Sequence, residues 1–190
     1  MGDTPFTAYA GDCLVRGFLD LPDGARLTDY LNEADTLKLS QAKLRALDDG
    51  RLVDAGDVEL DRSEVFACEA PPAPGTQQMR IRTRTTEIRV EIGPYEVVGL
   101  LHAPSAGDPL LVWNRRKQMV PITNASVTFP FAGHYRKVST EVLIINRHLV
   151  RSVERTKYEK SKIDDMGMKA VDPRAVDYTG TLGDAREGIL

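Results

Sequence analysis

Short apolar runs, several of them with an apolar residue at every second position, recur along the chain between clusters of turn-forming residues. In the first part of the chain they predict β-strands at residues 13–21, 37–39, 43–47, 53–60 and 65–68. Residues 22–24 (Pro-Asp-Gly) and 48–50 (Asp-Asp-Gly) are turn signals, and only residues 27–32 indicate a short helical turn. Gly17 interrupts the first strand and predicts a bend or a close backbone approach.

The same texture returns after the Pro-Pro-Ala-Pro-Gly segment at residues 71–75, which has the composition of a linker. Strands are predicted at residues 80–92, 95–101, 119–127, 137–145 and 149–153, with a loop at 129–133 and a tight turn at 146–148. From residue 157 onward polar residues dominate, which predicts a tail without a core of its own. The pattern as a whole predicts an all-β protein of small antiparallel barrels.

The two strand-rich segments repeat each other at a nearly fixed offset. Gly17 corresponds to Gly99, Asn32 to Asn114 and Asp61 to Asn146, so the offset rises from 82 to 85 residues. A self-match of this kind predicts an internal duplication. We therefore expect a first repeat at residues 1–70, a Pro-rich linker at 71–79, a second repeat at 80–156 and a flexible tail at 157–190.

The two repeats carry opposite charge. Residues 1–79 hold 15 acidic and 7 basic side chains, a net charge of −8, whereas residues 80–160 hold 7 acidic and 14 basic ones, a net charge of +7. Oppositely charged halves can attract each other between subunits, or the basic half alone can bind a polyanion. Simple drift between two duplicated copies with solvated faces is the third explanation.

Candidate interface residues follow from the strand periodicity. Asp57, Glu59 and Asp61 alternate along one strand, so their like charges repel unless water or a basic partner screens them. With Glu64 they form the candidate acidic face. Guanidinium groups bind phosphates and carboxylates equally well, so the basic residues fit a protein or an anionic ligand. The candidate basic face consists of Arg80, Arg82, Arg84, Arg115, Arg116 and Lys117.

Parts of both repeats resemble known small barrels. Residues 17–32, which read Gly-x-Leu-x-Leu-Pro-x-Gly-Ala-Arg-Leu-Thr-Asp-Tyr-Leu-Asn, resemble a motif of a bacterial family of uncharacterised domains that is similar to Sm-like barrels. Residues 97–101 and 143–153 are similar to the two Sm motifs. The resemblance implies two tandem Sm-like barrels, and in that family an Arg-Gly pair helps to hold RNA bases. Arg147 matches the arginine, His148 replaces the glycine, and the implied RNA-binding set is Trp113, Asn146, Arg147 and His148.

The sequence contains none of the familiar constellations of catalysis. Cys13 and Cys68 lack metal-ligand spacing and are expected to be reduced core residues, and the three histidines have no metal-like spacing either. No Gly-x-Ser-x-Gly elbow and no phosphate-binding glycine loop occurs. We therefore predict no catalytic residue, no metal, no cofactor and no enzymatic activity. The absence of a signal peptide and of a long apolar run predicts a cytoplasmic protein without membrane insertion.

These observations favour a non-catalytic scaffold or adaptor, one that forms a homo-oligomer or binds a partner protein through the acidic and basic faces. The alternative is an RNA-binding module that uses the basic second repeat. A second alternative is a sensor of a cyclic dinucleotide or another anion, because Arg80 and Arg84 fit the Arg-x-x-x-Arg element of PilZ domains. The Asp/Asn-x-Ser-x-x-Gly element that follows in those domains is not found.

Overall fold

The computed structural model of the 190-residue chain describes residues 2–71, 83–104 and 108–156. Arg80, Arg82, most of the predicted linker and the predicted tail lie outside the described residues. The first lobe, as residues 2–71 are called here, contains five strands, one α-helix and one 3-10 helix. These are β1 (Gly2–Tyr9), β2 (Cys13–Leu21), α1 (Leu27–Glu33), β3 (Thr36–Ala46), β4 (Leu52–Asp61), η1 (Arg62–Glu64) and β5 (Ala67–Ala70).

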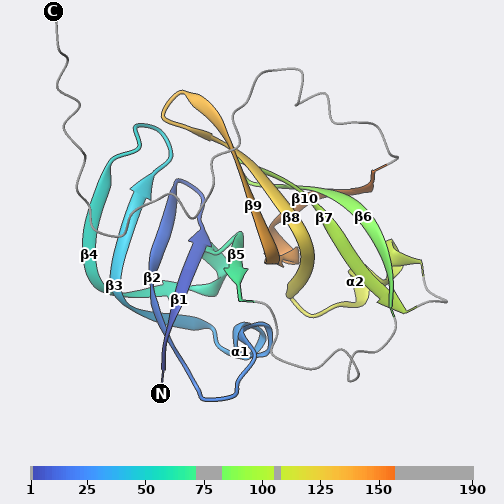
Figure 1. Ribbon diagram of the computed structural model, residues 1–190, viewed down its shortest axis with the longest axis horizontal. Coiled ribbons are helices and arrows are strands. Elements are labelled where there is room, and N and C mark those ends of the chain that lie inside the picture. The colour runs from blue at the N-terminus through green and yellow to red at the C-terminus, as the bar shows by residue number, and fades with distance from the viewer. Residues whose placement is uncertain (1, 72–82, 105–107, 157–190) are drawn as a thin grey trace, which may run out of the picture.

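The second lobe, residues 83–156, repeats this order of elements. It consists of β6 (Thr83–Ile92), β7 (Tyr95–Pro104), α2 (Pro109–Arg115), β8 (Met119–Phe131), β9 (His134–Asn146), η3 (Arg147–Leu149) and β10 (Val150–Arg155). Figure 1 shows the two lobes side by side, with β4 at the outer side of the first lobe and β5 in the middle of the molecule.

All ten strands belong to one antiparallel sheet with the order β10-β6-β7-β8-β9-β5-β1-β2-β3-β4. The prediction of an all-β protein is confirmed. Two tandem barrels are not confirmed, because the described strands form one continuous, open sheet rather than two separate ones. The physical reason is that β5 of the first lobe pairs with β9 of the second, which leaves β4 and β10 as the two edges of the sheet.

The same backbone irregularity lies at the same place in both lobes. The ladder between β2 and β3 shifts register next to Gly17, and the ladder between β7 and β8 shifts next to Gly99. Opposite these glycines, Gln41 and Asn124 have positive φ values of 51° and 48°. A Cβ atom on Gly17 would lie 2.9 Å from a backbone oxygen, so the close backbone approach predicted there is confirmed.

The core crosses the boundary between the lobes. Tyr9 of β1 is 2% exposed and packs edge-on against Tyr95 of the second lobe, with 5.4 Å between the ring centroids. The Tyr95 hydroxyl donates a hydrogen bond back to the carbonyl oxygen of Ala10. In the other direction, Met119 and Ile144 of the second lobe pack into the core of the first. The lobes therefore share buried apolar surface, the dominant stabilising term in folding.

Some predicted elements differ from the observed ones. The two strands predicted at 37–39 and 43–47 are a single strand, β3, which is irregular at Gln41. The loop predicted at 129–133 is wrong, because β8 continues to Phe131 and only Ala132 and Gly133 form the turn. Helix α2 was not predicted at all. Its signals are nonetheless present: Asp108 accepts a hydrogen bond from the Leu110 N–H as N-cap, and Pro109 occupies the first helical turn.

Candidate protein interface

The pairing of β5 with β9, which we call the inner junction, joins the two lobes. Its register sets Ala67 opposite Ile145 and Cys68 opposite Ile144. Ala67 is 1% exposed and the other three side chains are fully buried. One residue beyond the ladder, the Asn146 N–H donates a 2.9 Å hydrogen bond to the carbonyl oxygen of Phe66. The junction is therefore both hydrogen-bonded and closely packed.

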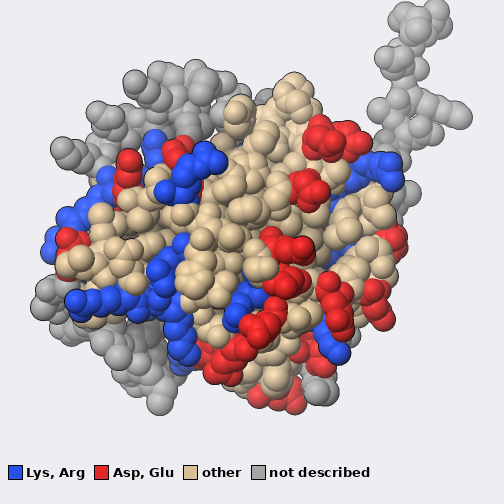
Figure 2. All heavy atoms as spheres, turned by 180° about the vertical axis from the view of Figure 1, so that it is seen from behind, with Lys and Arg blue, Asp and Glu red and all other residues tan. Residues whose placement is uncertain are grey.

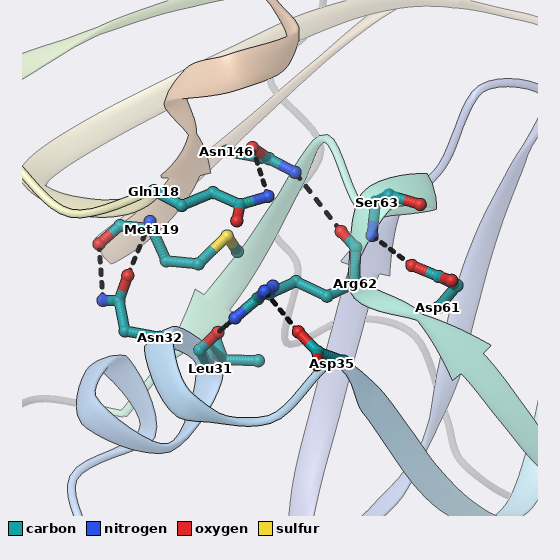
Figure 3. A network of polar contacts seen from close by, with 9 residues as sticks. All are labelled: Leu31, Asn32, Asp35, Asp61, Arg62, Ser63, Gln118, Met119 and Asn146. Atoms are coloured by element: carbon teal, nitrogen blue, oxygen red, sulfur yellow. Dashed lines mark hydrogen bonds and ion pairs between the residues drawn. The ribbon is translucent and has the colours of Figure 1, made fainter.

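Asn32, near the end of α1, fastens the first lobe to the start of β8. Its side-chain Nδ2 donates to the Met119 carbonyl oxygen at 3.0 Å, and its Oδ1 accepts from the Met119 N–H at 2.9 Å (Figure 3). The same amide nitrogen also donates to the Thr28 carbonyl oxygen within the helix. A side-chain amide is suited to this place because it offers a donor and an acceptor to one backbone residue.

Asn146 makes the second polar contact of the inner junction. Its Nδ2 donates to the Arg62 carbonyl oxygen of the first lobe at 3.2 Å. Its Oδ1 accepts from Gln118 at 3.3 Å and from the His148 N–H at 3.2 Å. Because Asn146 is fully buried, water does not replace these partners if the amide is lost.

Arg62 is held within the first lobe by its own contacts. Its guanidinium donates to the Leu31 carbonyl oxygen at 3.1 Å and forms an ion pair with Asp35 at 2.6 Å (Figure 3). Arg147 occupies the corresponding place in the second lobe, where its N–H bonds to the Gln118 carbonyl oxygen as that of Arg62 bonds to Asp35. The neutral Gln118 therefore occupies the position of Asp35, so the positive charge of Arg147 is not balanced by a carboxylate as that of Arg62 is.

Strand β4, one edge of the sheet, is acidic. It carries four carboxylates and no basic residue, and among the described strands it pairs only with β3. Its apolar Leu52 and Val53 are 50% and 40% exposed. Glu59 forms an exposed ion pair with Lys38 at 3.5 Å. The Asp61 carboxylate accepts a hydrogen bond from the Ser63 N–H at 2.7 Å. Hydrogen bonding from the Ser63 side chain, and then from this N–H, lowers the pKa of Asp61 below its usual value.

Strand β10, the other edge, carries two arginines and one glutamate. Among the described strands it pairs only with β6. Arg155 reaches Asp108, the N-cap of α2, at 2.5 Å. Hydrogen bonding from the Leu110 N–H, and then the contact with Arg155, lower the pKa of Asp108. Arg151 is exposed and has no side-chain partner among the residues that the structure describes.

The residues of the predicted acidic face are where the sequence analysis expected them. Asp57, Glu59 and Asp61 are exposed on β4, and Glu64 is exposed on η1 beside them. On the face seen in Figure 2, most acidic side chains gather over the first lobe and most basic ones over the second. The charge separation read from the sequence is therefore also a separation in space.

The predicted basic face is placed only in part. Arg84 is exposed at the start of β6, and Arg115 and Lys117 are exposed at the end of α2. Arg116 is half-buried, and its guanidinium donates to the His102 carbonyl oxygen at 2.7 Å, so it has a structural role. Because Arg80 and Arg82 lie outside the described residues, the Arg-x-x-x-Arg hypothesis of an anion sensor stays a prediction.

The residues implied by the Sm-like resemblance divide into two groups. Trp113 is 2% exposed within the core of the second lobe, and Asn146 is fully buried in the inner junction, so neither side chain presents a surface on which a base could stack. Arg147 is half-buried and His148 is exposed, and their side chains lie 3.3 Å apart at the tight turn predicted there. Only this second pair is accessible to a ligand.

Sequence reasoning gave no role to four residues that the structure makes notable: Asn32, which binds the backbone of Met119 across the inner junction, and the exposed Asn114, Arg151 and Arg155. Asn32 and Asn114 were aligned in the repeat, but the alignment alone gave neither of them a partner. Arg151 and Arg155 lie in a short strand outside the conspicuous basic clusters. The signal that could have found them is the repeat itself, once it is known which strands of the two copies pair.

The cysteines match their prediction of reduced thiols: Cys68 is buried, Cys13 is half-buried, and both are free. Within the described residues no group of His, Cys, Asp and Glu side chains is arranged to hold a metal ion. A mainly apolar hollow of about 530 Å³ lies beside β4 and is lined by Val15, Leu44, Val58 and Leu60, among others. Among the described helices, none has the length and apolar character needed to traverse a bilayer.

Comparison with known proteins gives no further guide to this site. No family model, no curated protein and no solved structure matches the chain.

Proposed function

We propose that this protein is a non-catalytic scaffold or adaptor that self-assembles head to tail, with the acidic edge of one molecule meeting the arginine-bearing edge of the next. The observation that carries the proposal is the pair of sheet edges. Strand β4 exposes four carboxylates and no basic residue, whereas β10 carries two arginines and one glutamate.

An unpaired strand at a sheet edge offers a row of backbone donors and acceptors to another strand. Because β4 and β10 are different surfaces, a contact between them is heterologous, and its repetition gives a closed ring or an open filament. The opposite charge of the two edges favours this pairing over β4 with β4, where carboxylates would face each other.

Light scattering coupled to size-exclusion chromatography tests the proposal. At low salt we expect species larger than one chain, and near 1 M salt we expect monomers, because the screening length falls to about 3 Å. Absorbance at 260 and 280 nm shows whether nucleic acid contributes to the mass. A chain that stays monomeric at every salt and protein concentration would overturn the proposal.

In this proposal each lobe is a small Sm-like barrel. The order of the strands supports this. The fifth strand of each lobe pairs with the first, β5 with β1 and β10 with β6, and the other strands follow in sequence. Every second residue of β7 is buried, so the buried side chains lie on one face of the strand. This pattern also fits a strongly curved sheet with a filled interior.

A second candidate function is RNA binding by the second lobe. It is favoured by the contrast between Arg62, which is paired with Asp35, and Arg147, which has Gln118 in place of that carboxylate. Fluorescence anisotropy with a labelled single-stranded RNA at low salt should then show binding, and Arg147→Ala should weaken it. Absence of binding at low salt would remove this candidate.

A further inference from the structure

We infer that the contact between molecules repeats the inner junction strand for strand: β10 of one copy pairs with β4 of a second copy in one defined register. The inference rests on the proposed self-assembly and specifies its geometry. In this contact, called the outer junction here, Ser152 lies opposite Leu60 of the second copy.

The register follows from positions that correspond in the two lobes. In the second lobe Met119 of β8 pairs with Asn146 of β9, and in the first lobe Thr36 of β3 pairs with Asp61 of β4. Asn146 therefore corresponds to Asp61, and β9 corresponds to β4 at an offset of 85 residues. Strand β5 corresponds to β10 at the same offset. Cys68 of β5 lies opposite Ala8 of β1, and its counterpart Val153 of β10 lies opposite Val90 of β6. Applying both relations to the pair Ala67 and Ile145 gives Ser152 opposite Leu60.

This register brings opposite charges together on one face of the new ladder. Arg155 lies opposite Asp57 and Arg151 lies opposite Asp61, while Glu59 lies diagonally between the two arginines. Directly opposed charges of opposite sign stabilise a pair of strands, whereas like charges destabilise it. A shift by one residue would place Arg155 opposite Val58 in one direction and Gly56 in the other, and neither residue carries a charge.

The helices supply an independent observation. Asn32 holds the backbone of Met119 across the inner junction, and Asn114 of α2 is its counterpart in the second lobe. Asn114 is exposed and makes no side-chain hydrogen bond with any described residue. The counterpart of Met119 is Thr36, the first residue of β3, which is also exposed. In the outer junction Asn114 of one copy reaches the N–H and carbonyl oxygen of Thr36 in the other.

Two differences make the outer junction weaker than the inner one. The position of the buried Tyr9 corresponds to Glu91, which is exposed, so the aromatic contact has no equivalent. Asp61 stands in the place of Asn146 and lacks the amide donor that meets the Arg62 carbonyl oxygen. Backbone pairing and charge therefore carry the outer junction, which agrees with reversible, salt-sensitive assembly.

Disulfide cross-linking between two variants that each carry one engineered cysteine tests the register. Both variants carry Cys13→Ser, while Cys68 is fully buried and burial raises the pKa of its thiol. Leu60→Cys in one chain and Ser152→Cys in the other should give a covalent dimer under mild oxidation at low salt. The matched control replaces Leu60→Cys by Val58→Cys, two residues along the same strand, and should give at least about tenfold less dimer, because diagonal neighbours lie about 7–8 Å apart.

The outcomes separate this inference from the proposed function. If light scattering shows oligomers but the Leu60 and Ser152 pair cross-links no better than the control, the register is wrong and self-assembly stands. If both variants and the unmodified chain are monomeric at low salt, self-assembly itself fails. Selective cross-linking of the first pair supports both.

Asn114→Ala gives a second readout that does not depend on oxidation. Loss of the contacts with Thr36 should weaken self-association by about tenfold, the effect of removing one or two hydrogen bonds. Leu111→Ala, also at an exposed position of α2, is the control, because its counterpart Asp29 makes no hydrogen bond or ion pair to the described part of the second lobe. Equal association of the Asn114 and Leu111 variants would contradict the helix contact.

Discussion

The buried amide of Asn146 shows how a single side chain can serve two lobes at once. It donates to the Arg62 carbonyl oxygen of the first lobe and accepts from Gln118 and His148 of the second. Neither a carboxylate nor a hydroxyl offers the same combination of donors and acceptor in this shape. The stability of the inner junction therefore depends on the chemical identity of this residue and not only on its size.

Asn146→Ala should lower the free energy of unfolding by about 1–3 kcal/mol, since it leaves buried polar groups without partners. Asn146→Asp, which has nearly the same shape, should be more harmful at neutral pH than at acidic pH. Its carboxylate would be buried against a carbonyl oxygen, which raises its pKa, so the penalty applies above that pKa and disappears as the pH falls below it. Urea unfolding at several pH values measures both effects.

The exposed counterpart, Asn114, provides the control for these variants. Asn114→Ala and Asn114→Asp should leave the unfolding of the monomer nearly unchanged, because the residue has no side-chain partner among the described residues. If the substitutions at both positions cost the same free energy, the structural role assigned to Asn146 is wrong.

His102 is a residue whose role depends on its protonation state. Its ring lies 3.0 Å from the hydroxyl of Thr83 and 2.7 Å from that of Thr123, and the nearby guanidinium of Arg116 is positive. Burial first, and then the charge of Arg116, lower the pKa of His102 below its usual value of 6.5. The ring is therefore neutral in the folded protein at neutral pH.

We expect the imidazole of His102 to titrate below pH 6.5 in an NMR pH titration. Because its pKa is lower in the folded state than in the unfolded state, its contribution to stability is fully present above about pH 6.5 and is lost as the pH falls through the folded-state pKa. The variant His102→Asn should show a smaller loss of stability between pH 7 and pH 5. A pKa above 6.5 would contradict this account.

At the scale of secondary-structure elements, the two edge strands differ in the sign of their charge. Each pairs with one described neighbour, yet β4 carries four carboxylates and no basic residue, whereas β10 carries two arginines and one glutamate. Surface ion pairs contribute only about 0–1 kcal/mol each, so their main effect here is to select a partner and a register. Reversal of one charge is therefore a sharper test than its removal.

Arg155→Glu should weaken self-association, because a carboxylate would then lie opposite Asp57. A mixture of this variant with Asp57→Arg should restore association, since the opposed charges are again of opposite sign. Analytical ultracentrifugation of each variant alone and of the mixture measures the effect. Arg136→Glu alone is the control for the charge reversal and should leave self-association unchanged, because Arg136 stacks on the Phe131 ring at 3.8 Å and does not belong to β10. Equal loss of association in the Arg136→Glu and Arg155→Glu variants would argue against the proposed pairing.

The sequence predicted the elements well where local patterns determine them. The strand periodicity, the turns with glycine and proline, the helix at residues 27–32 and the bend at Gly17 depend on a few neighbouring residues. Helix α2 is short, and its residues, which lie between the strands predicted at 95–101 and 119–127, were assigned to no element. The burial of Trp113 and Asn146 could not be read locally, because burial depends on which distant strands pack together.

The inner junction was beyond prediction for the same reason. The residues of β5 and β9 are apolar in the sequence, which indicates burial but does not tell what buries them. A barrel closed within each repeat and a sheet continuous between repeats place the same side chains in the core. Only long-range pairing, with about 75 residues between partners such as Cys68 and Ile144, distinguishes the two arrangements.

At the scale of the whole molecule, the two lobes form one structural unit. Tyr9 and Leu14 of the first lobe are part of the second lobe's core, and Met119 and Ile144 are part of the first's. Lobes that share a core in this way should unfold together, unlike two domains that are joined only by a linker.

Urea unfolding at high salt should therefore show one transition. Fluorescence of Trp113 reports on the second lobe, and amide hydrogen exchange of β2 and β3 reports on the first, and both should give the same midpoint. Tyr9→Ala removes the aromatic contact between the lobes and should lower the midpoint of both signals. Two separate midpoints in the unmodified chain would contradict a shared core.

The pairing of β5 with β9 has a consequence for the stoichiometry of any ring. One junction in every two is built into the polypeptide, so a closed assembly of whole chains contains an even number of lobes, and rings with five or seven lobes are excluded. The junctions also alternate around such a ring between a permanent contact within a chain and a reversible one between chains. Dilution or salt would release intact pairs of lobes and never single ones.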